Sequence, residues 1–213
     1  MNKNNIESKE EQKINRLDYN LIVKTVKENS KVLDLGCSMG TLLALLKEKK
    51  QTDGRGIEIN PKKVQKCIEQ GFSVLHGDLD EGLKHYADNS FDYVIFNQTI
   101  QVVKNSLLVL QEALRVGKKV IVSFPNFGHW QTRLSFAFSG KMPKSKALPY
   151  EWYNTPNIRI LTIKDFRDLC NRNDVNILKE KSYLALNGKN RLINFWPNTF
   201  ATNSLFILEQ NKI

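Results

Sequence analysis

The segment at residues 31–40, KVLDLGCSMG, constrains the fold of this chain more than any other. An apolar run that contains Asp34 leads into a turn with Gly36 and Gly40, and a leucine-rich segment follows. This order is typical of a buried strand that leads through a tight loop into a helix. Because glycine has no Cβ, the backbone near Gly36 and Gly40 can approach a ligand closely. The segment therefore predicts a ligand-binding loop at the end of the first strand of an α/β fold.

A second acidic residue supports a ligand site. Residues 55–59 have strand character, and Glu58 follows the glycine turn at roughly the 20-residue distance at which dinucleotide-binding folds place a carboxylate on a ribose. The glycine spacing departs from that fingerprint, because Gly36 and Gly40 stand four positions apart. The alternative is that both glycines only shape a strand-to-helix turn.

The segment resembles the first motif of class I S-adenosylmethionine (SAM)-dependent methyltransferases, an acidic residue followed by a GxGxG-type loop. Ser38 stands where the middle glycine of that loop is expected. If this position requires a positive φ, a serine there is strained or crowds the loop. The resemblance implies SAM or its demethylated product, S-adenosylhomocysteine, as the cofactor.

Strand and helix patterns alternate along most of the chain. Apolar runs predict strands at 32–35, 54–59, 72–77, 91–97 and 118–124, with helices between them. Asn60 and Pro61 have the types expected at the start of a helix, and Thr162 with Asp165 has capping-box spacing. We therefore expect a doubly wound, mostly parallel sheet of the Rossmann-like methyltransferase type, with helices on both faces. Residues 175–186 and 204–210 are expected to add an antiparallel C-terminal hairpin.

Ligands of such open sheets bind outside the carboxyl ends of the strands. Asp78 and Asn97 follow the third and fourth predicted strands, and Ile59 and Leu79 could flank an adenine ring. Alternatively, Asp78 only caps a short segment and Ile59 belongs to the core. The residues expected to bind the cofactor are Asp34, Gly36, Cys37, Ser38, Gly40, Glu58, Ile59, Asp78, Leu79 and Asn97.

Length and composition favour one domain of ordinary size, at residues 16–213, after a flexible polar leader at residues 1–15. No signal peptide or membrane span is evident, so we expect a cytoplasmic protein without a membrane partner. The three cysteines and three histidines are scattered, which predicts neither a disulfide framework nor a metal site.

The net charge of +10 raises the possibility of a nucleic-acid partner. Lysine outnumbers arginine, however, and the basic clusters are short and mixed with acidic residues. Arginine is the residue that bidentate phosphate or base recognition favours. We therefore interpret most of the charge as solvated surface, and a nucleic-acid role as unlikely.

Residues 125–160 break the alternation and are rich in proline and aromatic residues. A connection of this length is usually functional, so we expect residues 125–156 to form a partner surface or a lid over the ligand site. The alternative is that Trp130, Tyr150, Trp152 and Tyr153 close the core. His129 is the one conspicuous candidate base, although a packed structural histidine is equally compatible with the sequence. The catalytic residues are therefore left unknown.

The segments PNFGHW and LPYEWYNTPN, with GDLDEGL and FDYVIFNQTIQVV, resemble the MetW family of methionine biosynthesis proteins. This resemblance implies a methyltransferase-like domain that works with the homoserine O-acyltransferase of the methionine pathway. We therefore expect a SAM-binding partner or regulator of that enzyme. An active methyltransferase for a small molecule is the alternative, and a nucleic-acid methyltransferase rests on charge alone.

Overall fold

The computed structural model describes residues 17–144, 150–186 and 189–211, apart from the side chains of residues 186 and 189. The leader expected at residues 1–15 lies outside these ranges. The strands are β1 (Lys31–Leu35), β2 (Asp53–Glu58), β3 (Ser73–His76), β4 (Phe91–Asn97), β5 (Gly117–Pro125), β6 (Val175–Leu186), β7 (Lys189–Leu192) and β8 (Asn203–Gln210). The helices are α2 (Leu17–Thr25), α3 (Thr41–Lys50), α4 (Pro61–Glu69), α5 (Ser106–Val116), α6 (Trp130–Ser139), α7 (Ile163–Arg172) and α8 (Pro197–Phe200), with 3₁₀ turns η1 (Leu79–Glu81) and η2 (Ile100–Val102).

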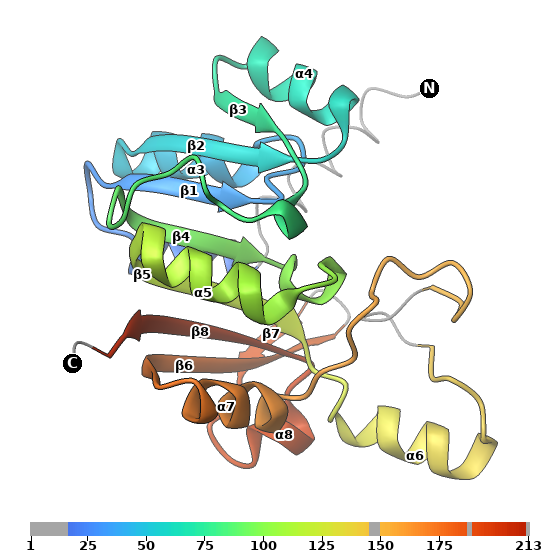
Figure 1. The fold of residues 1–213 in the computed structure, drawn as a ribbon. Helices are drawn as coiled ribbons and strands as arrows, with labels where there is room; N and C mark the ends of the chain where they lie inside the picture. The colour runs from blue at the N-terminus through green and yellow to red at the C-terminus, as the bar shows by residue number, and fades with distance from the viewer. Residues whose placement is uncertain (1–16, 145–149, 187–188, 212–213) are drawn as a thin grey trace.

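The strands form one sheet in the order β3-β2-β1-β4-β5-β8-β6-β7, shown in Figure 1. Strands β1 to β5 are parallel, whereas β8 runs antiparallel to both β5 and β6. The order reverses at β1, from which β2 and β3 extend to one side and β4 and β5 to the other. The predicted doubly wound, mostly parallel sheet is thus confirmed, as is its antiparallel C-terminal end.

Side chains that alternate along the strands form two buried layers, one on each face of the sheet. Leu33, Val94 and Phe96 pack with α5 and α7 on one face of the sheet, where Figure 1 shows these helices in front. Val32 and Ile95 pack with α2 and α3 on the opposite face. Neighbouring strand residues point to opposite faces, and both faces are covered, which explains why these strands read as continuous apolar runs.

The predicted helix boundaries rest on observed capping contacts. The Asn60 side chain accepts hydrogen bonds from the backbone N–H groups of Lys62 and Lys63, and Pro61 occupies the first turn of α4. Thr162 and Asp165 form the reciprocal capping box that begins α7. Each device satisfies N–H groups that have no partner within the helix.

Two features of local structure were not predicted from the sequence. Residues 125–160 are not without regular structure, because ten of them form α6. The two predicted C-terminal strands pair as expected, but β7 and α8 lie between them in the chain. In neither case does a buried apolar face mark the missed helix, since no residue of α6 or α8 is buried.

Candidate functional site

A crevice of about 550 Å³ opens at the carboxyl ends of β1, β2, β3 and β4. Parallel pairing brings these ends to the same edge of the sheet, with Leu35 beside Ile57 and Glu58 beside His76. Seven of the residues expected to bind the cofactor line the crevice: Gly36, Ser38, Glu58, Ile59, Asp78, Leu79 and Asn97. Segments far apart in the sequence therefore meet where the strand order reverses, the usual ligand position of this architecture.

Glu58 joins the loop after β1 to the end of β2. Its Oε2 accepts a hydrogen bond from the Ser38 N–H at 2.9 Å, and its Oε1 accepts one from the Asn60 N–H at 2.9 Å. The residue is 6% exposed and lines the crevice. Each carboxylate oxygen carries two lone pairs, so both can accept a further bond from a ligand hydroxyl.

The first glycine of the loop is required by its surroundings. Gly36 has φ +76°, which favours glycine, and its N–H donates to the Ile57 carbonyl at 2.8 Å. A Cβ at Gly36 would lie 2.8 Å from Thr99 Cγ2. Gly36 therefore allows the β1 loop to pack against the segment that follows β4.

Ser38 adopts the left-handed conformation that the sequence raised as a possibility. Its φ is +53°, and its side chain is exposed at the crevice. Its carbonyl accepts a hydrogen bond from Cys67 Sγ at 3.2 Å, while its N–H is held by Glu58. A residue with a Cβ costs roughly 1 to 2 kcal/mol in this conformation, so the loop holds serine against a local preference for glycine.

Cys37 and Gly40 lie in the same loop but do not line the crevice. Cys37 is buried and packs with Leu43 and Cys67, and this burial raises the pKa of its thiol. Gly40 has φ +75° and precedes α3, and a Cβ there would lie 3.2 Å from Cys67 Sγ. Both residues shape the loop from beneath.

Asp34 lies beneath the crevice on β1 and is also absent from its lining. Burial, and secondarily the charge of Glu58, raises the pKa of Asp34 to about 7. Asp34, Glu58 and Asp78 together place three carboxyl groups in or beneath the crevice. A positive charge on a ligand would favour the ionised form of Asp34.

Asp78 caps a short segment and also lines the crevice. Its Oδ1 accepts a hydrogen bond from the Asp80 N–H at 2.9 Å and so caps η1, yet the residue also lines the crevice. Ile59 is 61% exposed, which excludes the core alternative for that residue. Leu79 is buried and faces the same crevice. The wall thus offers two apolar side chains beside a carboxylate.

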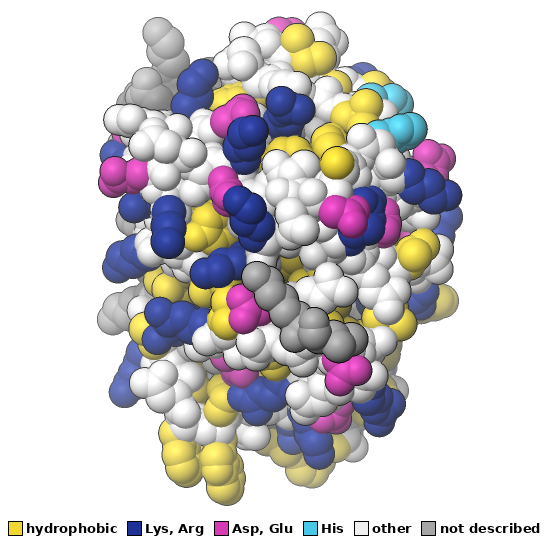
Figure 2. Space-filling view, turned by 60° about the vertical axis from the view of Figure 1, so that its left-hand side comes forward, with side chains coloured by type: hydrophobic (Ala, Val, Ile, Leu, Met, Phe, Trp, Pro, Cys, Tyr) yellow, Lys and Arg dark blue, Asp and Glu magenta, His cyan; other side chains and the backbone are white. Residues whose placement is uncertain are grey.

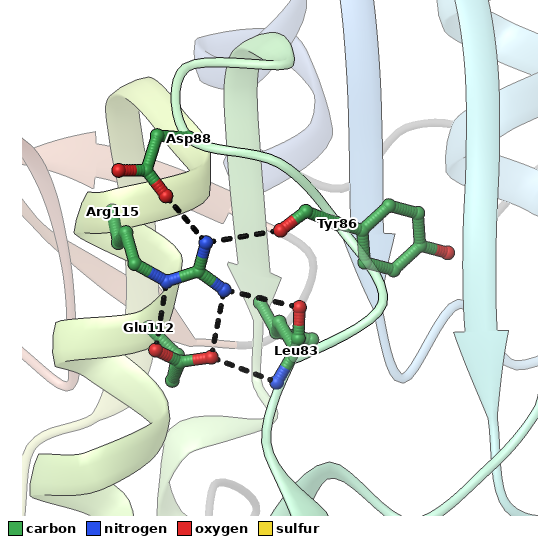
Figure 3. A network of polar contacts seen from close by, with 5 residues as sticks. All are labelled: Leu83, Tyr86, Asp88, Glu112 and Arg115. Carbon is green, nitrogen blue, oxygen red and sulfur yellow. Dashed lines mark hydrogen bonds and ion pairs between the residues drawn. The ribbon is translucent and has the colours of Figure 1, made fainter.

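The loop that carries Asp78 and Leu79 is fixed to α5 by Arg115, as Figure 3 shows. The guanidinium donates to the carbonyls of Leu83 and Tyr86 and pairs with Asp88 and Glu112. The Glu112 carboxylate also accepts a hydrogen bond from the Leu83 N–H. These contacts raise the pKa of Arg115, and they hold the loop after β3 in place.

The loop is tied to the next segment as well. The Asp80 carboxylate accepts hydrogen bonds from the N–H groups of Lys104 and Asn105, at 3.0 and 2.6 Å. The crevice wall that bears Asp78 is therefore joined to η2 and α5 by several contacts.

Sequence reasoning missed the part of the crevice that follows β4. This part comprises Gln98, Thr99, Val102, Val103 and Lys104, and the lining also includes Lys63 and Pro156. The Gln101 carbonyl accepts hydrogen bonds from the N–H groups of Ile158 and Arg159, which fastens the segment after Pro156 to η2. Asn97 is held by a 2.7 Å hydrogen bond that its Oδ1 accepts from Ser123 Oγ. A single 3₁₀ turn has no periodic pattern that could have revealed these residues.

His129 lies away from the crevice. It is 4% exposed, and desolvation lowers the pKa of its imidazole. It lines a separate hollow of about 590 Å³ with Trp130, Phe195 and Phe200. The packed-histidine alternative thus describes its position, and the crevice lining contains no histidine.

The residues that the structure describes have three further features, which concern metal binding, membrane crossing and surface charge. They hold no group of three or more His, Cys, Asp or Glu side chains arranged to bind a metal. None of their helices is long and apolar enough to cross a lipid bilayer. Figure 2 shows Lys and Arg scattered over one face with Asp and Glu among them, the mixed distribution expected of solvated surface. A larger hollow, of about 740 Å³ between α5 and α7, contains none of the expected site residues.

The sequence of this chain is similar to those of known proteins. The family described as methionine biosynthesis protein MetW matches residues 16–208. Over 173 residues the chain is 38% identical to the bifunctional methionine biosynthesis protein MetXA/MetW of Rhodopirellula baltica. That match covers 77% of this chain and 28% of the relative, so the chain spans less than a third of the relative's length.

Solved structures share the fold. A SAM-dependent methyltransferase of Thermotoga maritima, described as a possible histamine N-methyltransferase, aligns with a TM-score of 0.68 at 17% identity and covers 94% of this chain and 91% of its own. A SAM-dependent methyltransferase of Archaeoglobus fulgidus gives a TM-score of 0.68 at 16% identity, with 93% and 94% covered. At these identities the likeness shows the class I methyltransferase fold alone.

Proposed function

Because the chain belongs to the MetW family of methionine biosynthesis proteins, we propose that it binds SAM or S-adenosylhomocysteine and acts as a partner or regulator of homoserine O-acyltransferase. The observation that carries the ligand proposal is the position of Glu58. Its carboxylate stands at the end of β2, fixed by two backbone N–H groups, and faces a crevice of about 550 Å³. Such a preorganised acceptor suits the two hydroxyls of a ribose.

The surrounding residues suit the rest of an adenosine. In the proposed complex Ile59 and Leu79 flank the adenine ring, and Asp78 accepts a hydrogen bond from its amine. The methionine portion lies toward Gly36 and Ser38, where the ligand can come close to the backbone of the loop. Pockets for small molecules commonly combine apolar walls with a few convergent polar groups in this way.

The charge of the site favours the sulfonium form of the ligand. Glu58 and Asp78 line the crevice together with Lys63 and Lys104, and Asp34 lies beneath it on β1. SAM carries a positive sulfonium, whereas S-adenosylhomocysteine has a neutral thioether. We therefore expect SAM to bind more tightly than S-adenosylhomocysteine.

The partner proposal rests on the fused relative. In the Rhodopirellula protein a MetW part and a MetXA part share one polypeptide, and we take the MetXA part to be the acyltransferase that the family resemblance implies. Fusion keeps two modules at a high effective concentration, which is useful when they associate. We propose that the present chain makes the same association between separate polypeptides.

A regulatory role follows if ligand and partner are coupled. SAM is derived from methionine, the end product of the pathway. A protein that binds SAM differently when free and when bound to the acyltransferase can report methionine supply to that enzyme. Coupling is reciprocal, so the acyltransferase must then change the affinity for SAM by the same factor as SAM changes the affinity for the acyltransferase.

Calorimetry tests the proposal. The chain is titrated with SAM and with S-adenosylhomocysteine, alone and with the purified acyltransferase of the same organism. We expect saturable binding and a change in affinity when the acyltransferase is present. Absence of binding in both titrations would refute the ligand proposal, and acceptor-dependent release of S-adenosylhomocysteine would support the alternative of an active small-molecule methyltransferase.

A further inference from the structure

Helix α6 presents an apolar stripe that the described part of the chain does not cover. Trp130, Leu134 and Phe138 follow one another at intervals of four residues and share one side of the helix. They are 42%, 46% and 86% exposed. None of the ten residues of α6, all of which the structure describes, is buried. Figure 1 shows the helix projecting from the end of β5, apart from the helices that cover the sheet.

A helix of this kind needs a partner for its apolar side. Isolated helices shorter than about 12 residues are marginal in water, and most helical stability in proteins comes from packing of one face. Aromatic residues and serine are not strong helix formers, so local propensity does not replace that packing. Burial of the stripe would therefore stabilise α6.

The base of α6, in contrast, is held firmly. The buried Asn126 donates to the carbonyls of Asn198 and Ala201, and its Oδ1 accepts hydrogen bonds from the N–H groups of Gly128 and Ile163. A Cβ at Gly128 would lie 2.8 Å from Asn198 Oδ1, so only glycine allows this close approach. The direction in which α6 leaves the sheet is thus set by contacts of the segment between β5 and α6.

The stripe continues into a neighbouring hollow. Trp130 lines the hollow of about 590 Å³ together with Leu192, Phe195 and Phe200. The last three residues are 43%, 70% and 41% exposed. We call the α6 surface the set Trp130, Leu134, Phe138, Leu192, Phe195 and Phe200. Neighbouring exposed apolar side chains of this kind are typical of interaction sites.

The charged residues in the segments that build the α6 surface are all basic. Residues 126–143 and 190–202, which build it, contain Arg133, Lys141 and Arg191 and no Asp or Glu. A second copy pairing through the same surface would bring these basic residues of the two copies toward one another, which like-charge repulsion disfavours. The complementary surface is apolar at its centre and carries carboxylates around it.

We propose that the α6 surface is the docking site for homoserine O-acyltransferase, and that the enzyme meets it with an apolar patch rimmed by acidic residues. This inference rests on the partnership proposed above and adds its location. Trp130 and Phe195 are of the aromatic type that dominates interface energetics. The α6 surface shares no lining residue with the crevice, so SAM and the acyltransferase can bind together.

Biolayer interferometry with the immobilised acyltransferase of the same organism tests the location. Leu134→Asp and Phe138→Ser each change an exposed side chain, and Ile68→Asp on α4 is the matched control because Ile68 is 58% exposed. We expect Leu134→Asp to weaken binding at least about 30-fold, which corresponds to the 2 kcal/mol that defines a hot spot. Phe138→Ser should weaken it in the same direction, and Ile68→Asp should bind as the wild type does. Thermal melts of all three variants establish that each is folded.

The outcomes separate the location from the partnership. If the wild type binds the acyltransferase and both α6 variants bind it equally well, the α6 surface is not the docking site, while the partnership stands. No binding by the wild type would overturn both, and the SAM titrations would still judge the ligand proposal independently. A wild-type dimer in sedimentation that Leu134→Asp dissociates, with acyltransferase binding unchanged, would assign the surface to a second copy and overturn the inference.

Discussion

The carboxylate of Glu58 accepts a hydrogen bond from the N–H of Ser38 across 2.9 Å, so the acidic end of one strand fixes the loop of its neighbour. The two residues lie on elements separated by α3, and parallel pairing of β1 with β2 brings them together. Ser38, which has a positive φ, and Glu58, the residue proposed to bind the ribose, therefore hold each other in position.

Replacing Glu58 should reduce ligand affinity. Glu58→Ala removes the proposed charge-assisted bonds to the ribose. It also leaves the N–H groups of Ser38 and Asn60 without the carboxylate that accepts their hydrogen bonds in the wild type. We expect SAM binding to weaken by roughly 1.5 to 3 kcal/mol in calorimetry. Glu48→Ala, on the exposed side of α3, is the control and should bind normally. Unchanged affinity in Glu58→Ala would remove the residue from the site.

Ser38→Gly should tighten SAM binding, because glycine accepts the observed φ of +53° without cost. Stability should change by less than about 1 kcal/mol, since the greater freedom of glycine in the unfolded chain offsets part of the gain. Asn89→Gly is a matched control, because Asn89 also has φ +53° and does not line the crevice. A loss of affinity in Ser38→Gly alone would show that the hydroxyl contacts the ligand.

Asp34 should make stability depend on pH. Its pKa is about 7 in the folded chain and 3.8 ordinarily, so between these values the folded state keeps a proton that the unfolded state releases. The free energy of unfolding should therefore fall as pH rises from about 4 to about 7, by on the order of 3 kcal/mol between pH 5 and pH 8. Urea unfolding at both pH values measures this change.

Asp34→Asn is the diagnostic variant for that dependence. The amide does not titrate, so the fall between pH 5 and pH 8 should be largely absent, whereas Asp53→Asn at an exposed position should behave as the wild type does. Equal pH dependence in the wild type and Asp34→Asn would show that another group is responsible.

Trp152→Ala should leave the melting temperature of the isolated chain nearly unchanged. Trp152 is 73% exposed and Tyr153 is 69% exposed, which contradicts the alternative that these rings close the core. Phe166→Ala, at a core position that is 3% exposed, should by comparison cost roughly 3 to 5 kcal/mol of folding stability. Differential scanning calorimetry distinguishes the two, and early melting of Trp152→Ala would restore the core interpretation.

The sequence predicts the parallel part of the fold best where its strands are buried on both faces, as in β1, β4 and most of β5, because such strands are nearly continuous apolar runs. Asn60 and Thr162 mark helix starts for a similarly local reason, since their side chains bond to N–H groups two or three residues away. The position of the crevice follows from topology, because all parallel strands end at one edge.

Prediction from the sequence failed where the structure depends on contacts with distant segments, or on the side to which a side chain or a helix face points. Cys37 lies in the predicted loop, but spacing alone does not show that its side chain points inward to Cys67. Helix α6 has its apolar stripe on the exposed side, so no pattern of core burial identifies it. Thr99 lines the crevice beside Gly36, whose lack of a Cβ allows the β1 loop to approach it.

The anchoring of α6 through Asn126 also bears on the thermodynamics of association. A docking element that is ordered only on binding loses conformational entropy at that moment, and the loss is subtracted from the affinity. Here four hydrogen bonds at Asn126 fix the helix origin in the unbound chain. A protein that meets the α6 surface consequently finds the start of the helix already positioned, so only the ordering of the helix itself is subtracted from the affinity.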